Sequence, residues 1–266
     1  MNVESTTPII NGLIEKIRNI TVSENIPLLG FGPASAMANE PTGYRPEDLL
    51  PGAKGLLCFA IPLPRAIYNM STYKAEMVCR SQSENYRYLD MLSIRFANLL
   101  EESGFKALPI FGCQPMGVNK KRGYVEGYIN QLKMGEVTGI GIIGNNRLLI
   151  NSRYGARLMI GSVITTSEFP AISYPESKEP GCPPDCRICE DVCPVKAISI
   201  EKKRLSIMRC LGYTAKTPLM SQIKFALLCK FKPGKAARLM FQTALDEHTL
   251  HICSKCVALC PYGDEK

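Results

Sequence analysis

Two cysteine arrays in the second half of this 266-residue chain constrain its fold more than any other feature. Residues 182–194 read C-x3-C-x2-C-x3-C-P, residues 253–261 read C-x2-C-x3-C-P, and Cys210 lies between them. This spacing is close to that of the cysteines that ligate cubane iron–sulfur clusters. We therefore predict a protein that transfers electrons.

The arrays also predict which cysteines share a cluster. In two-cluster ferredoxins, the cysteine before the proline of each array ligates the cluster held by the other array. Cluster one would then be held by Cys182, Cys186, Cys189 and Cys260. Cluster two would be held by Cys193, Cys253, Cys256 and one further cysteine.

Cys210 and Cys229 are the candidates for the eighth ligand. We favour Cys210, because Cys229 lies in an apolar run, FALLCKF, that resembles protein core. The three-residue gap after Cys182 departs from the usual two, so this cysteine fits the motif less well than its neighbours. Zinc sites or free thiols are the alternatives, but zinc has no requirement for a proline after the last cysteine.

The rest of the composition is that of an ordinary globular protein. The amino terminus has no export signal and no long apolar run occurs, so we expect a cytoplasmic protein without a transmembrane segment. In that compartment twelve cysteines indicate metal or redox chemistry rather than disulfides. The net charge of +8 is compatible with an acidic partner, although a mild excess more often serves solubility.

Hydrophobic periodicity predicts helices and strands that alternate as far as residue 166. Helices are expected at 8–20, from 83 to about 102, and at 124–134, with a helical turn at 46–50. Strands are expected at 26–31, 55–62, 107–111, 147–151 and 157–166. Residues 167–184 have the composition of a linker, so we place a domain boundary near Glu179, giving domains 1–178 and 179–266.

A glycine-rich segment matches the dinucleotide pattern G-x-G-x-x-G at Gly139, Gly141 and Gly144. That fingerprint requires a strand before it, a helix after it and an acidic residue about twenty positions later. Here a helix-like stretch precedes it and a strand-like stretch follows. We reject a Rossmann site and interpret the glycines as a tight turn near a cofactor.

Residues 139–166, GIGIIGNNRLLINSRYGARLMIGSVITT, resemble the signature shared by epoxyqueuosine reductases and reductive dehalogenases. Residues 45–64 are similar to an early strand of that family, and the order of the cysteine motifs also matches. The resemblance implies an α+β protein, with a nitroreductase-like α/β domain followed by a ferredoxin-like module that carries two four-iron four-sulfur (4Fe-4S) clusters. It also implies a corrinoid (cobalamin) in the first domain, with FMN as the alternative.

By position, the same resemblance places one turn and the start of a strand beside the corrinoid. The residues concerned are Gly139, Gly141, Gly144, Asn145, Asn146 and Arg147.

The sequence departs from the family where the proton donor is expected. The queuosine enzymes have an acidic residue just before Pro115, whereas this chain reads Phe-Gly-Cys-Gln at 111–114. An extra stretch at 116–128 offers substitutes, and we predict Tyr124 with Lys121 as proton donor, by similarity to the tyrosine and basic residue of dehalogenases. A surface loop with a basic cluster is the alternative interpretation.

Two further departures concern the ends of the sequence and the segment between the arrays. Six residues follow Cys260, so we expect no helical-repeat domain of the kind that helps the queuosine enzymes hold tRNA, and we expect no twin-arginine signal of the kind typical of dehalogenases. Residues 211–252 form an insertion that we interpret as a helical lid. The alternative is an amphipathic element that binds a membrane surface, tRNA or an acidic electron donor.

The leading hypothesis is a cytoplasmic iron–sulfur oxidoreductase that acts on a small or nucleoside-like substrate. It would pass electrons from an external low-potential donor through two clusters to a corrinoid or flavin. The alternative is a non-catalytic electron-transfer protein that reduces or reactivates a partner such as a corrinoid protein. Nucleic-acid binding, for instance to tRNA, is a third hypothesis, and only the positive net charge supports it.

Overall fold

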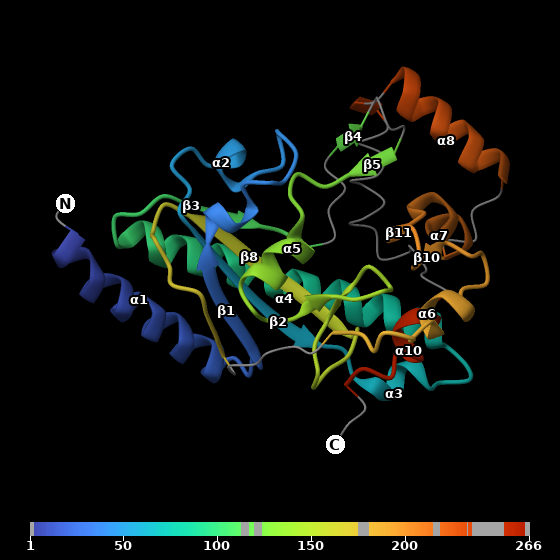
Figure 1. The fold of residues 1–266 in the computed structure, drawn as a ribbon, viewed down its shortest axis with the longest axis horizontal. Coiled ribbons are helices and arrows are strands. Elements are labelled where there is room, and N and C mark those ends of the chain that lie inside the picture. The colour runs from blue at the N-terminus through green and yellow to red at the C-terminus, as the bar shows by residue number, and fades with distance from the viewer. Residues whose placement is uncertain are drawn as a thin grey trace.

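The computed structural model describes residues 3–112, 117–119, 124–174, 181–214, 219–232, 234–235 and 253–263 (Figure 1). The helices are α1 (Val3–Ser23), the 3-10 helix η1 (Ala34–Met37), α2 (Pro46–Leu49), α3 (Arg65–Tyr68), α4 (Lys74–Glu102), α5 (Gln131–Val137), α6 (Ile188–Asp191), α7 (Ile207–Thr214), α8 (Leu219–Phe231) and α10 (Lys255–Ala258). The strands are β1 (Leu28–Pro33), β2 (Gly55–Pro62), β3 (Ala107–Ile110), β4 (Gly117–Asn119), β5 (Tyr124–Glu126), β6 (Ile142–Ile143), β7 (Leu149–Ile150), β8 (Leu158–Thr165), β9 (Ile172–Tyr174), β10 (Ile198–Ser199) and β11 (Arg204–Leu205).

A five-stranded sheet in the order β3-β8-β2-β1-β9 forms the centre of the molecule. Each pair of neighbouring strands in it is antiparallel. The register places Cys58 of β2 between Gly30 of β1 and Ser162 of β8. The protein therefore combines helices with an antiparallel sheet, as the α+β prediction requires.

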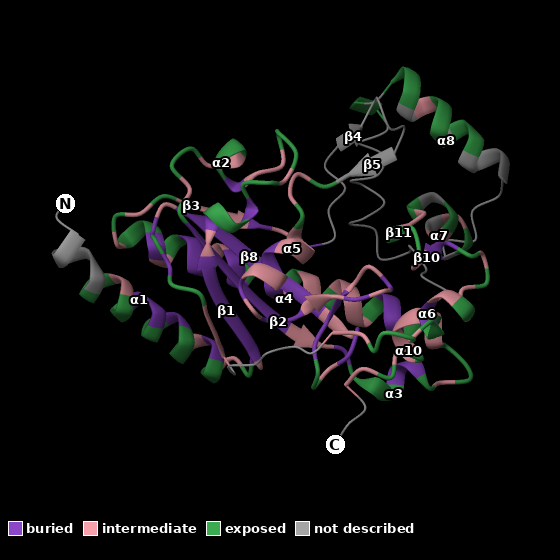
Figure 2. Ribbon diagram, in the orientation of Figure 1, coloured by how far each residue is buried: buried purple, intermediate pink, exposed green. Residues whose placement is uncertain are grey.

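Alternating side chains of the central strands divide the core into two layers. On one face, α1 and α4 cover the sheet, and Ile17, Phe59 and Phe96 are fully buried there. On the other face, α5 and η1 cover Leu56 and Ile164. The strands are consequently apolar on both faces, which explains why residues 55–62 form a continuous apolar run. Figure 2 shows the central strands buried between their helices.

Most of the predicted elements are found. The apolar run 55–62 is β2 in full, the first helix extends to Ser23, and α4 begins nine residues before the predicted start at Ser83. As predicted for a small core residue, Cys58 is fully buried.

Two predictions about local structure are wrong. Residues 124–134 do not form one helix: β5 covers 124–126, and α5 starts only at Gln131. The Asn130 side chain caps α5 by accepting the Lys133 N–H at 3.2 Å, which fixes the helix start there. The supposed linker 167–184 contains β9, because residues 172–174 pair with β1 at the edge of the sheet.

The described residues beyond the sheet form short elements. α6 packs against α10, the β10–β11 hairpin lies close to α6, and α8 extends away from the sheet (Figure 1). The predicted boundary near Glu179 lies outside the described residues, and the division into two domains stays a prediction. None of the described helices combines the length and apolarity needed to span a membrane.

Candidate metal centre

Three short helices and the loops around them carry the eight cysteines of the arrays. α6 carries Cys189, α7 carries Cys210 and α10 carries Cys256. Direct packing of α6 on α10 brings the two arrays together, although 67 positions separate these two helical cysteines. All eight thiols are free of disulfide bonds.

One set of thiols gathers around Cys189. Burial, followed by the nearby Cys182, Cys186 and Cys260, raises the pKa of Cys189 to about 11. The pKa of Cys260 is raised by burial and then by Cys182 and Cys186. These four cysteines are the predicted ligands of cluster one.

A second set gathers around Cys256. Its pKa is raised to about 12, first by burial and then by the thiols of Cys210, Cys253, Cys189 and Cys193. Apart from Cys189, which belongs to the first set, these are the predicted ligands of cluster two. The grouping coincides with the predicted ligand sets, while the assignment of ligands stays a prediction. The side chain of the rival Cys229 lies outside the described residues.

The donor set of four thiols in each group fits iron–sulfur ligation chemically. Within the described residues, no three His, Cys, Asp or Glu side chains form a group that could hold one metal ion. A zinc ion requires its ligands about 2.3 Å from a single point, whereas a cubane has several irons to which the cysteines can bind. Iron would also bind the thiols as thiolates, overcoming the raised pKa values.

Backbone N–H groups donate to two of the sulfurs. The Ala197 N–H donates to Cys193 Sγ at 3.1 Å, and the Asn145 N–H donates to Cys182 Sγ at 3.4 Å. Hydrogen bonds to the sulfurs help to set the reduction potential of a cluster, because they favour its more negative reduced state. Each predicted cluster therefore has a donor that could tune its potential.

The predicted glycine turn packs against the cysteine loops. Asn145 Nδ2 donates to the Cys186 carbonyl at 3.1 Å, and Asn146 Nδ2 donates to the Cys256 carbonyl at 3.5 Å. Two of the glycines lie so close to Ile150 that a side chain would clash with it. A Cβ on Gly141 would lie 2.6 Å from the Ile150 carbonyl oxygen, and one on Gly144 would lie 2.9 Å from the Ile150 side chain.

The remaining two predicted cofactor contacts also have neighbours in the protein. Gly139 has φ +75°, and a Cβ there would lie 3.2 Å from Ser173. Arg147 has a left-handed backbone, with φ +62°, and its charge helps to lower the pKa of Glu136. The contacts that the structure describes therefore link this turn to the sheet and the cysteines, and contact with a corrinoid stays a prediction.

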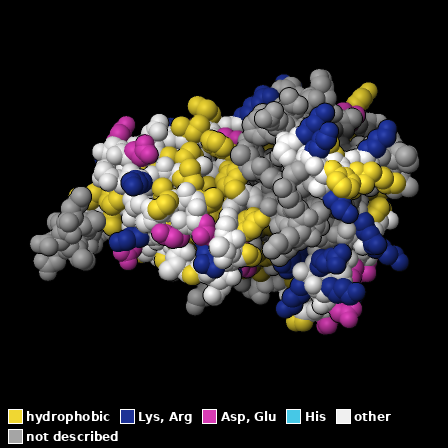
Figure 3. Space-filling model, turned by 90° about the horizontal axis from the view of Figure 1, so that it is seen from above, with side chains coloured by type: hydrophobic (Ala, Val, Ile, Leu, Met, Phe, Trp, Pro, Cys, Tyr) yellow, Lys and Arg dark blue, Asp and Glu magenta, His cyan; other side chains and the backbone are white. Residues whose placement is uncertain are grey.

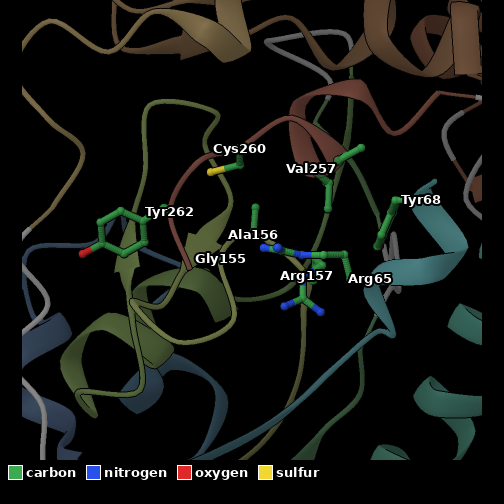
Figure 4. Close-up of a pocket in the computed structure, with 9 residues that line it drawn as sticks. Arg65, Tyr68, Gly155, Ala156, Arg157, Val257, Cys260 and Tyr262 are labelled. Atoms are coloured by element: carbon green, nitrogen blue, oxygen red, sulfur yellow. The ribbon is translucent and has the colours of Figure 1, made fainter. Parts of the chain in front are cut away.

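A small pocket lies beside Cys260 (Figure 4). Arg65, Tyr68 and Arg157 line it, and its cavity volume is about 10 Å³. Cavities that enclose drug-sized ligands measure about 300–1,000 Å³, so this pocket does not fit a corrinoid. The two arginines place positive charge next to a predicted cluster, which favours the reduced cluster.

Two glycines allow the backbone after the second array to lie directly against the loop before β8. Gly155 and Gly263 have φ values of +61° and +82°. A Cβ on Gly263 would lie 2.2 Å from the Gly155 nitrogen, and one on Gly155 would lie 2.3 Å from the Tyr262 carbonyl oxygen. Only residues without a Cβ allow the chains to approach this closely.

The predicted proton donors lie where the structure describes little. Tyr124 begins β5 and pairs with Asn119 of β4, but its side chain lies outside the described residues, as does all of Lys121. Cys113 lies there as well. The proposed role of Tyr124 with Lys121 stays a prediction.

Sequence reasoning missed an acidic group at the end of β3. Asp90 of α4 is half-buried, and its Oδ1 accepts the Gly112 N–H at 2.9 Å. Burial raises the pKa of this carboxyl to about 6, against the lowering effect of the Gly112 hydrogen bond. Next to it, Tyr128 Oη accepts the Phe111 N–H at 2.9 Å. No sequence signal pointed to Asp90, because it meets Gly112 across 22 positions.

The fold and the paired cysteine arrays together define a mixed α+β protein with a cysteine-rich region. No family model matches the chain. The epoxyqueuosine reductase of Lactococcus garvieae is 34% identical over 79 residues, covering 30% of this chain and 21% of that protein. That of Bacillus cereus is 27% identical over 179 residues, covering 65% of this chain and 43% of that protein.

Solved structures show the same likeness in fold. The epoxyqueuosine reductase of Streptococcus thermophilus superposes with a TM-score of 0.60 at 18% identity, covering 94% of this chain and 66% of that one. An epoxyqueuosine reductase solved with a modified tRNA stem loop also gives 0.60 at 18% identity, covering 97% of this chain and 67% of its own. The predicted resemblance is confirmed: the chain is related to the epoxyqueuosine reductases, which are oxidoreductases. It spans less than half of the length of the two curated relatives.

Proposed function

We propose that this protein is an iron–sulfur reductase, in which two 4Fe-4S clusters carry electrons from an external low-potential donor to a reductive reaction. The observation that carries the proposal is the convergence of the eight array cysteines into two sets, around Cys189 and Cys256. Cys189 also acts on the pKa of Cys256, so the two clusters would be close neighbours.

The chain's own residues supply three functions in this scheme. The thiols hold the clusters in sequence, so that electrons arrive singly. The N–H groups of Asn145 and Ala197 favour the reduced form of each cluster. Arg65 and Arg157 add positive charge beside Cys260, which further favours reduction of that cluster.

The acceptor of these electrons would be a group bound by the sheet domain, a corrinoid as the family resemblance implies, with FMN as the alternative. A low-valent corrinoid supplies the electrons for breaking a carbon–heteroatom bond. The described pocket beside Cys260 is too small for a corrinoid. The relatives' name supports an epoxide on a nucleoside-like molecule as the substrate class, and the solved complex supports tRNA as its carrier.

An anaerobic reconstitution experiment tests the proposal. The protein is loaded with iron and sulfide, and its iron content, absorption and electron paramagnetic resonance spectra are recorded before and after reduction. Two clusters require about eight irons per chain. Cobalamin and then FMN are added to separate samples, and a shift in the visible spectrum identifies the acceptor. A protein that takes up one zinc per array instead of iron would contradict the proposal.

A basic segment at residues 202–245 favours a second candidate function, electron transfer to or from a protein partner. Residues 202–245 contain ten of the 32 Lys and Arg residues and none of the 24 Asp and Glu residues. The rest of the chain therefore carries 22 basic and 24 acidic residues. Figure 3 shows exposed Lys and Arg side chains gathered at the end of the molecule that carries the cysteine module.

Such a basic region around Cys210 suits an acidic redox protein, since complementary charge steers the encounter of two proteins. The functions differ in whether a substrate is consumed. A carrier would exchange electrons with an acidic redox protein at a rate that falls steeply with added salt, and would reduce no epoxide even with the acceptor group bound. Consumption of an epoxide by the loaded, reduced protein would exclude a carrier without catalysis.

A further inference from the structure

The residue that would protonate the substrate is missing from the position where the family resemblance implies it, at residues 111–114. The structure explains why a side chain is excluded from one of these positions. A Cβ on Gly112 would lie 2.3 Å from Cδ1 and 2.5 Å from Cε1 of the Tyr86 ring. Tyr86 of α4 therefore fills the space that a side chain at 112 would need.

A carboxyl group reaches the same place from a different element. Asp90 lies one helical turn after Tyr86 on α4, and it accepts the Gly112 N–H at 2.9 Å through Oδ1. Its other oxygen, Oδ2, forms no hydrogen bond within the described part of the chain, so it can carry a proton. The side chain is half-buried rather than sealed, which leaves it a route to solvent.

The surroundings of Asp90 favour a proton-bearing group. β3, β8 and α3 pack against α4. Neither strand contains a titratable side chain, and α3 carries Arg65 and Tyr68. On the same helix, the Tyr86 ring lies beside Gly112. Beyond β3, Tyr128 Oη accepts the Phe111 N–H, and the pKa of this phenol is raised first by burial and then by the charge of Asp90. Among the residues that the structure describes, no ion pair to Asp90 forms.

We propose that Asp90 is the general acid of the reductive reaction, taking the place of the acid that is missing from the strand end. This inference rests on the proposed function. Conversion of an epoxide to an alkene breaks two C–O bonds, consumes two electrons and two protons, and releases the oxygen as water. The external donor supplies the electrons through the clusters. Asp90 gives a proton to the oxygen as the first C–O bond breaks, is reprotonated by solvent, and gives the second as water leaves.

The raised pKa supports this role. Burial lifts the pKa of the carboxyl from 3.8 to about 6, so the acid form is abundant at mildly acidic pH and about a tenth of it remains at pH 7. A carboxyl with a pKa near the working pH is an effective proton donor.

The first test does not depend on turnover. The reconstituted protein is treated at pH 6 with a water-soluble carbodiimide and glycine ethyl ester, which modify accessible protonated carboxyl groups, and the labelled sites are located by mass spectrometry. We expect label at Asp90. In ¹³C spectra of protein labelled at aspartate, one carboxyl should titrate near pH 6 and be lost in Asp90→Asn. An unlabelled Asp90, or the absence of such a titration, would overturn the proposal.

The second test measures turnover of a small cyclic epoxide by the reduced, cofactor-loaded protein. General acid catalysis contributes about 10²- to 10⁴-fold, so Asp90→Asn should lower the rate at pH 6 by about 100-fold or more. Asp90→Glu should retain part of the activity. The wild-type rate should fall as pH rises through 6, and Asp90→Asn should lose this dependence. Glu84→Gln, an exposed carboxyl on the same helix, is the matched control and should leave the rate unchanged.

The outcomes separate the two proposals. Normal iron content and cluster reduction in Asp90→Asn, combined with lost turnover, supports the acid role. Undiminished turnover in that variant excludes Asp90 as the acid and leaves the reductase function intact. A wild-type protein that labels at Asp90 but consumes no epoxide would refute the proposed reaction, while still identifying an accessible proton-bearing carboxyl.

Discussion

Replacing Asp90 by asparagine should stabilise the folded protein at neutral and alkaline pH. Burial raises the pKa of this carboxyl from 3.8 to about 6. The folded state therefore holds its proton more tightly than the unfolded state, and ionisation costs folding free energy. Asparagine keeps an oxygen for the Gly112 N–H but carries no charge, so it removes this cost.

The size of the effect follows from the same values. A rise from 3.8 to about 6 corresponds to about 3 kcal/mol at 1.36 kcal/mol per pKa unit. Because the side chain is only half-buried, solvent screening reduces this, and we halve it to about 1.5 kcal/mol. The cost is absent below pH 3.8, grows between about pH 4 and 6, and is complete above 6. For a chain of this size, about 1.5 kcal/mol raises the Tm by about 3–6 °C.

The assay is anaerobic calorimetry of the reconstituted wild type, Asp90→Asn and the control Glu84→Gln at pH 5 and pH 8. The stabilisation by Asp90→Asn should be larger at pH 8 than at pH 5. Glu84→Gln should show no such growth, since Glu84 is exposed and pairs with Arg80 and Arg87. If Asp90→Asn destabilises the protein at pH 8, the carboxylate is stabilised where it lies, and both the raised pKa and its use as an acid would be refuted.

Three further predictions concern the clusters and the core. Cys210→Ser should lower the iron content by about half and Cys229→Ser should leave it unchanged; an equal loss in both would refute the choice of Cys210. Gly263→Ala should unfold at lower denaturant concentration than Gly104→Ala and lose iron: both glycines have φ above +80°, but only at 263 does a Cβ meet the backbone, 2.2 Å from Gly155. Ile17→Ala should lower the free energy of unfolding by about 2–5 kcal/mol, because the side chain is fully buried, whereas Val22→Ala, at 69% exposure, should change it little.

Sequence patterns predicted the elements whose formation depends on local periodicity. The apolar run 55–62 is β2, and the helix expected from 83 to about 102 lies within α4. The helix expected at 124–134 failed because capping by Asn130 starts α5 late, and because residues 124–126 pair with β4 instead. Strand β9 was missed for a similar reason: it exists through pairing with β1, a partner more than 140 positions away.

The cysteine spacing alone predicted a redox protein, because ligand spacing within a cluster motif is a local property of the chain. The two sets of thiols were predicted from the crossed ligation of two-cluster ferredoxins, and the packing of α6 on α10 brings the two arrays together. Only the tertiary structure brought the carboxyl of Asp90 to the end of β3 and filled the space beside Gly112 with Tyr86. An aspartate inside a helix is indistinguishable in sequence from an ordinary surface residue. Its burial, and with it the raised pKa, results from the packing of α4 against β3 and β8.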